Sequence, residues 1–94
     1  MAGPVDNRQR LVEMRARLEA AFAPDRLDIV DDSDKHVGHA GARGGAGHFQ
    51  VHISSRDFAG KRPLARHRMV YAALADMMQR DIHALQIFAR TPDE

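Results

Sequence analysis

The sequence contains no cysteine and no tryptophan, and aromatic residues make up only 5% of it. Without cysteine the chain has no disulfides, no thiol nucleophile, no CxxC zinc site and no thiolates of its own for an iron–sulfur cluster. Long apolar runs are also missing, and the N-terminal MAGPVDNRQR lacks the apolar stretch of a signal peptide. We therefore expect a soluble, cytoplasmic protein that does not enter a membrane.

A strong charge of either sign is missing as well, because 14 Lys and Arg residues against 13 Asp and Glu residues give a net charge of +1. This balance falls short of the basic composition expected of a dedicated nucleic-acid binder. A chain of 94 residues supports one hydrophobic core and leaves little room for a catalytic cleft. We expect a single domain over residues 1–94, with its core over about 7–90, that is not an enzyme.

The N-terminal half of the chain reads as a helix, a strand and a loop. Apolar residues at helical spacing, such as Met14 and Leu18, predict an amphipathic helix over 7–22 that ends before Pro24. Alternation of charged and apolar residues then predicts a short strand over 26–31. Most of the seven glycines lie within residues 33–47, a composition typical of a mobile loop.

The C-terminal half predicts a strand, a helix and a last strand. Strict alternation over 48–53 turns Phe49 toward the core and His48 outward. Pro63 suits the first position of a helix over 63–78. A strand over 82–89 follows, and a right-handed crossover makes it parallel to one of the others. The order predicts an α/β sandwich, in which helices cover a small three-stranded sheet.

Three histidines lie in the predicted regular elements away from the last strand. His48 and His52 have the i, i+4 spacing of a helical metal pair, but in a strand this spacing spans about 13 Å and separates them too far to bind one ion. We therefore expect both to be solvated on the outer face. His67 lies in the apolar stripe of the second helix, where a hydrogen-bonded, buried imidazole is the usual occupant.

The other three histidines are better candidates for a metal site. His36 and His39 lie in the glycine-rich loop, where they are either simply exposed or able to carry a ligand to a partner. His83 begins the last strand on the same face as Leu85, which predicts a half-buried ring with one reachable nitrogen. Spacing alone leaves both a structural role and a ligand role open for His83.

Taken together, several segments of the chain resemble the BolA family. The resemblance covers residues 8–92, and its most specific pieces are Phe-x-Gly, Arg-His-Arg-x-Val-Tyr and Ile-His-Ala-Leu in this order and spacing. The matching segments are DSDKHVGH (32–39), His48-Phe49, SSRDFAGK (54–61), RHRMVY (66–71) and DIHAL (81–85).

The resemblance implies a fold like the class II KH domain, with the order α-β-β-α-(short α)-β and a mixed three-stranded sheet. It also implies pairing with a monothiol glutaredoxin and a shared 2Fe-2S cluster, in iron–sulfur cluster trafficking and in iron or stress regulation. By motif, one cluster ligand falls on His83 and the second on His36, with His39 as its rival, whereas His67 matches a structural position. The resemblance thus describes a cluster-binding adaptor.

The lack of cysteine agrees with that role, because this chain contributes only imidazoles to a cluster. The thiolates then come from the glutaredoxin cysteine and its glutathione. Two histidines on one iron and sulfur ligands on the other would resemble a Rieske-type arrangement, which raises the reduction potential relative to ligation by thiolates alone.

The alternative that the resemblance leaves open is a DNA-binding transcriptional regulator. Its candidate contacts are cations around the start of the second predicted helix: Lys61, Arg62, Arg66 and Arg68. Against it, the GxxG loop with which KH domains clamp a nucleic-acid backbone is absent between helices, and the sequence suggests no exposed aromatic platform. A homodimer of the chain is a further arrangement that the sequence leaves open.

Overall fold

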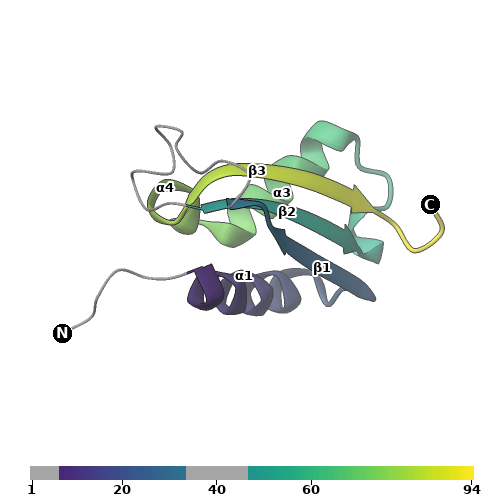
Figure 1. The fold of residues 1–94 in the computed structure, drawn as a ribbon. Helices are drawn as coiled ribbons and strands as arrows, with labels where there is room; N and C mark the ends of the chain where they lie inside the picture. Colours follow the sequence, from purple (N-terminus) through teal and green to yellow (C-terminus); the bar gives the residue numbers. More distant parts are fainter. Residues whose placement is uncertain (1–6, 34–46) are drawn as a thin grey trace.

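A computed structural model describes residues 7–33 and 47–94. Most of the loop predicted over 33–47 lies outside the described residues. The element order is the one that periodicity and the resemblance predicted, including a short helix before the last strand (Figure 1). The elements are α1 (Asn7–Phe22), β1 (Arg26–Asp31), β2 (Gly47–Ser54), the 3-10 helix η2 (Arg56–Phe58), α3 (Pro63–Leu74), α4 (Met77–Arg80) and β3 (Ile82–Arg90).

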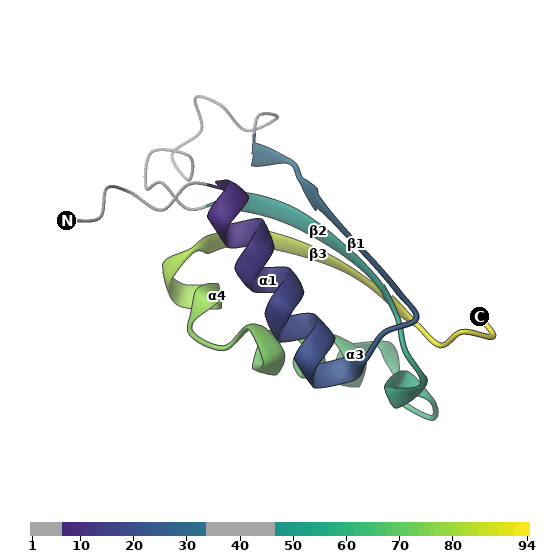
Figure 2. The same ribbon diagram turned by 90° about the horizontal axis from the view of Figure 1, so that it is seen from below.

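The three strands form one mixed sheet in the order β1-β2-β3. β1 pairs with β2 antiparallel, and β2 pairs with β3 parallel, which confirms the predicted parallel last strand. The helices lie on one face of the sheet, as Figure 2 shows from below, and the opposite face is left open by the described residues. Side chains that point to the open face are therefore not covered by a helix of the described residues.

The core lies between the sheet and the helices. In α1 the buried residues recur every fourth position, at Arg10, Met14, Leu18 and Phe22, so one stripe of the helix faces the sheet. In β2 every second residue is buried among apolar neighbours, as period two requires. The buried apolar residues are Met14, Leu18, Phe22, Leu27, Phe49, Val51, Ile53, Phe58, Val70, Leu74, Met77, Ile82 and Ile87.

The helix predicted over 63–78 is in fact two helices. α3 ends at Leu74, where the next residue, Ala75, has a positive φ of 51° with ψ of −126°, and α4 begins at Met77. A residue held in such a sparsely populated backbone region costs about 1–3 kcal/mol. It turns the chain so that Met77 is fully buried in the core, which offsets that cost. The short helix then leads directly into β3.

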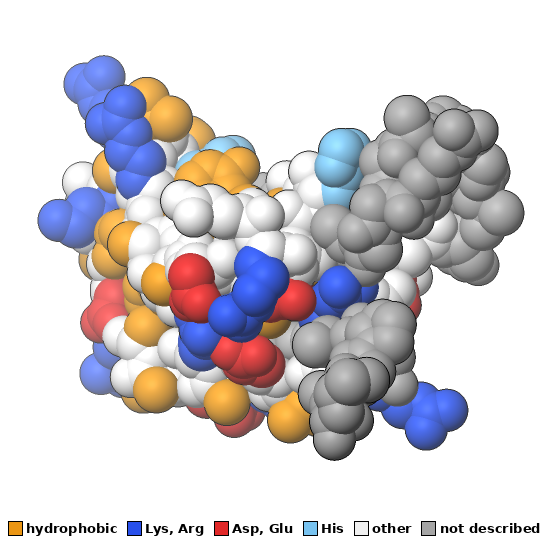
Figure 3. Space-filling model, turned by 90° about the vertical axis from the view of Figure 1, so that its left-hand side faces the viewer, with side chains coloured by type: hydrophobic (Ala, Val, Ile, Leu, Met, Phe, Trp, Pro, Cys, Tyr) orange, Lys and Arg blue, Asp and Glu red, His pale blue; other side chains and the backbone are white. Residues whose placement is uncertain are grey.

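Ion pairs join α1 to α4 and to the start of β3. Figure 3 shows acidic and basic side chains interleaved on this face of the molecule. Arg17 Nη1 donates to Asp76 Oδ1 (3.0 Å) and to the Leu74 carbonyl (2.7 Å), and Arg17 also pairs with Glu13. The hydrogen bond from Arg17 is the main cause that lowers the pKa of the Asp76 carboxyl below its usual value.

A second, buried pair lies deeper in the same region. Arg10 Nε donates to Asp81 Oδ1 (3.3 Å), and their side chains are only 9% and 3% exposed. Arg80 Nε donates to the other carboxylate oxygen at 2.7 Å. The Asp81 carbonyl accepts from the backbone N–H of Gly47 (2.9 Å), so this residue holds both α1 and the first residue of β2. Asp81 thereby fixes where β3 begins.

Candidate functional site

A β-bulge places His83 on the open face of the sheet. Gly47 on β2 lies opposite Ile82, but the next residue, His48, lies opposite Ala84, so His83 is the extra residue of β3. A Cβ at Gly47 would lie 2.5 Å from two ring carbons of Phe49, so glycine is needed at this point. Bulges shift the alternation of a strand by one residue and re-aim its side chains.

The sequence prediction for His83 was therefore wrong in its orientation. Strict alternation placed it half-buried on the face of Leu85, but in the structure His83 is exposed while Leu85 remains half-buried against the core. The extra residue at the bulge accounts for the difference, and sequence periodicity carries no signal of it. The imidazole of His83 is thus more accessible to solvent than predicted.

His48, in contrast, is less exposed than predicted. It points outward as expected, but it is buried, with 7% of the residue exposed, rather than solvated. Its ring lies against the ring of His83, with centroids 5.0 Å apart and planes tilted by 52°. The bulge brings about this contact, because it places His83 on the face to which His48 points.

His52 lies farther along the same face and belongs to a separate pair. Its ring is half-buried and stacks on Phe88 with centroids 4.5 Å apart, and its Nε2 lies 3.1 Å from Gln50 Oε1. Phe88 is 41% exposed, so the open face does present an aromatic side chain, contrary to the sequence prediction. His52 and His48 do not meet, as their strand spacing predicted.

The residues that flank the segment 34–46 lie close together beside His48. The His48 N–H donates to Ser33 Oγ (3.0 Å), and the Asp32 N–H donates to the His48 carbonyl (2.7 Å). Ser33 Oγ also accepts from Asn7 Nδ2 (2.9 Å), which ties this point to α1. His36 and His39, the predicted loop ligands, lie outside the described residues.

The predicted nucleic-acid contacts divide into two kinds. Arg66 donates to both carboxylate oxygens of Glu94 (2.6 and 3.0 Å) and to the carbonyls of Lys61 and Ala89 (2.8 and 3.1 Å). Hydrogen bonds from Arg66 lower the pKa of the Glu94 carboxyl to about 2. Lys61, Arg62 and Arg68 are exposed. Arg66 is thus placed for a structural role, whereas the other three side chains reach solvent.

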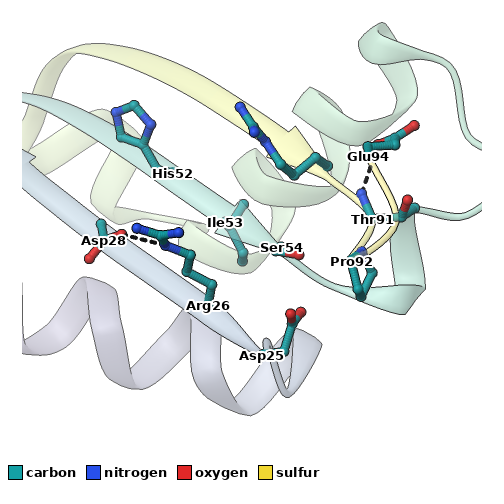
Figure 4. A pocket seen from close by; sticks show the side chains of 10 residues that line it. Asp25, Arg26, Asp28, His52, Ile53, Ser54, Thr91, Pro92 and Glu94 are labelled. Atoms are coloured by element: carbon teal, nitrogen blue, oxygen red, sulfur yellow. Dashed lines mark hydrogen bonds and ion pairs between the residues drawn. The ribbon is translucent and has the colours of Figure 1, made fainter.

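His67 and a polar hollow at the other end of the sheet are not part of the His48–His83 pair. His67 on α3 is half-buried rather than buried as predicted. The hollow in Figure 4, of about 390 Å³, lies where β1 begins and β3 ends. Its charges offset one another, with Arg26 Nε donating to Asp28 Oδ2 at 3.2 Å. His52, at its edge, has its Nε2 within 3.1 Å of Gln50 Oε1.

The chemistry available at His83 is that of a single exposed imidazole. Within residues 7–33 and 47–94, no group of three or more His, Asp or Glu side chains is placed to hold a metal ion. Since the chain has no cysteine, any thiolate ligand to a metal at His83 would come from another molecule. No helix of the described part is long and apolar enough to cross a membrane.

Comparison with known proteins gives one consistent family. The model of the family described as BolA-like protein matches residues 18–94. The chain is 42% identical to BolA-like protein 1 of Homo sapiens over 96% of this chain and 60% of that one. It is 40% identical to the DNA-binding transcriptional regulator BolA of Escherichia coli, over 93% and 77% of the two chains.

A third relative has a solved structure. The chain is 41% identical to SufE-like protein 1 of Arabidopsis thaliana over 90% of this chain, but it spans only 24% of that protein. The solved BolA domain of that protein superposes with a TM-score of 0.80 at 38% identity, covering 89% of this chain and 93% of the domain. The similarity therefore extends over the whole α/β fold described above.

Proposed function

The chain belongs to the BolA-like protein family, and from that premise we propose that it acts in the cytoplasm as an adaptor without catalytic activity of its own. It pairs with a monothiol glutaredoxin and shares a 2Fe-2S cluster, as cargo, in iron–sulfur cluster trafficking and in iron or stress regulation. The observation that supports this most is an exposed imidazole at a β-bulge in a chain without thiolates.

His83 would be the ligand on the last strand, and His36 the ligand on the loop, with His39 as its rival. A histidine binds iron through a neutral ring nitrogen. An accessible imidazole whose ring is already oriented loses little conformational entropy when it binds. The glutaredoxin cysteine and its glutathione would supply the sulfur ligands. The cluster, when shared, supplies electron-transfer and iron–sulfur chemistry, and this chain supplies ligands and a docking face.

Reconstitution with a monothiol glutaredoxin tests the proposal. We expect this chain alone, incubated anaerobically with iron, sulfide and glutathione, to stay colourless, because it has no thiolates. The mixture with the glutaredoxin should form a heterodimer whose visible circular dichroism and EPR spectra differ from those of the glutaredoxin's own cluster homodimer. A stable cluster on the isolated chain, or spectra identical to those of the homodimer, would contradict the proposal.

DNA binding is the second candidate function, and one observation favours it. Lys61, Arg62 and Arg68 are exposed around the start of α3, and a helix N-terminus with nearby cations attracts phosphate. The E. coli relative is named as a DNA-binding transcriptional regulator. Because Arg66 is bonded to Glu94 and to two carbonyls, this surface offers fewer cations to a phosphate than the sequence suggested.

The salt dependence of binding tests whether this surface holds DNA. If Arg62 and Arg68 each neutralise a phosphate, the double variant Arg62→Gln/Arg68→Gln should flatten the log–log slope of affinity against salt by about 0.9 for each arginine replaced. Fluorescence anisotropy on a labelled duplex measures the slope. Arg8→Gln, which replaces an exposed arginine at the start of α1, is the matched control. Binding that is undetectable at about 150 mM salt would remove this candidate.

A further inference from the structure

We infer that His48 is a positioning residue for His83, whose exposed imidazole it holds in one orientation for ligation. The inference rests on the proposed function and deepens it, since it adds to the ligand site a residue that binds no metal itself. It follows from the contact between the two rings, from the burial of His48 and from the way the backbone of His48 is held.

The rings of His48 and His83 are in contact. The His48 and His83 rings lie with centroids 5.0 Å apart and planes tilted by 52°, which is the range of a favourable aromatic pair. An exposed histidine at the start of a strand would otherwise sample several rotamers, and a ligand that must be ordered on binding loses affinity. Contact with a fixed neighbour removes part of that loss.

His48 can act as the fixed neighbour because its backbone is bonded on both sides. Its N–H donates to Ser33 Oγ at 3.0 Å, and its carbonyl accepts from the Asp32 N–H at 2.7 Å. The residue that follows it, Phe49, is 2% exposed in the core, so the strand cannot slide at this point. The backbone that carries the His48 ring is therefore held in place beside His83.

Burial separates the positioning role from a ligand role. Both ring nitrogens of His48 are inaccessible to solvent, so a metal could reach them only if the ring left its place. His83, in contrast, is exposed beside it. The two side chains thus have different roles: His83 offers a ring nitrogen to the metal, and His48 offers a surface against which the His83 ring packs. Groups that orient a metal ligand typically change metal affinity by 10–100-fold when they are removed.

The experiment compares His48→Phe, which keeps a flat ring, with His48→Ala, which removes it. In the unloaded chain, NMR should show nuclear Overhauser effects between the His48 and His83 rings, and one dominant His83 rotamer. His48→Phe should preserve that rotamer, while His48→Ala should give averaged rotamers. In the reconstituted complex, His48→Ala should release the cluster about 10-fold faster, and His48→Phe less than about twofold faster. His52→Ala, on the same strand and face, is the matched control.

The outcomes separate this inference from the proposed function. If His48→Phe releases the cluster as fast as His48→Ala does, a nitrogen of His48 is required and the positioning role is wrong. Averaged His83 rotamers in the unaltered chain would also contradict it, even if His48→Ala does not fold. If the unaltered chain forms no cluster with a glutaredoxin, the proposed function fails, while the rotamer measurements still decide whether His48 holds His83.

Discussion

Replacing His83 with alanine is expected to abolish the stable cluster that we propose this chain shares with a monothiol glutaredoxin. Within the described residues His83 is the one exposed imidazole at the bulge, and alanine leaves no ligand in its place. Because the side chain is exposed, its loss should change the melting temperature of the unloaded chain little. Visible circular dichroism of the reconstituted complex should lose the heterodimer spectrum, and any remaining colour should match the glutaredoxin homodimer.

Two further variants make this test specific for ligation. His52→Ala removes an imidazole from the same face but from a ring that stacks on Phe88, and it should leave the spectrum unchanged. His83→Cys keeps a ligand but replaces nitrogen by thiolate, so we expect a cluster with an altered EPR signal and a lower reduction potential. Equal loss in all three variants, or no loss in His83→Ala, would contradict the assignment of His83.

Replacing Asp81 with alanine is expected to destabilise the fold by about 3–5 kcal/mol, because it leaves the buried Arg10 guanidinium without its carboxylate. A domain of this size has a total stability of about 5–15 kcal/mol, so the loss is a large part of it. The variant should also loosen the start of β3, since Arg10 and Arg80 no longer converge there. Urea denaturation followed by far-ultraviolet circular dichroism measures the change.

Asp76→Ala is the matched control for this second prediction. Asp76 pairs with Arg17 and Arg80 in the same group of charges, but its side chain is 57% exposed, so water replaces the missing carboxylate. We expect a far smaller shift of the urea midpoint than for Asp81→Ala. Equal shifts in the two variants would mean that burial of the Arg10–Asp81 pair does not matter.

The elements of the fold were predictable from local patterns. The helix over 7–22 and the strand over 26–31 have the bounds that the apolar spacing predicted, since each has one face against the core and therefore a strict period. The break at Ala75 was not predictable from periodicity, because alanine favours helix and the local sequence pattern carries no signal of its positive φ. The resemblance, not the spacing, implied a short helix there.

The sequence motif made His83 a candidate ligand, but it did not indicate the surroundings of this residue. The burial of His48 and its contact with His83 depend on a bulge between two strands that lie far apart in the chain. The role of Arg66 also depends on residues far along the chain. Its partner Ala89 lies near the end of β3, and its partner Glu94 lies beyond β3. Pairing register and long-range hydrogen bonds have no local signature.

The sequence by itself determined which chemistry the chain can offer: imidazoles without thiolates, one core and a near-neutral charge. It determined the order of helices and strands as well, because each element shows its buried face as a period in the sequence. Only the tertiary structure decided which imidazole reaches solvent. A single extra residue in β3 reversed the alternation, and so it exposed His83 against a buried His48.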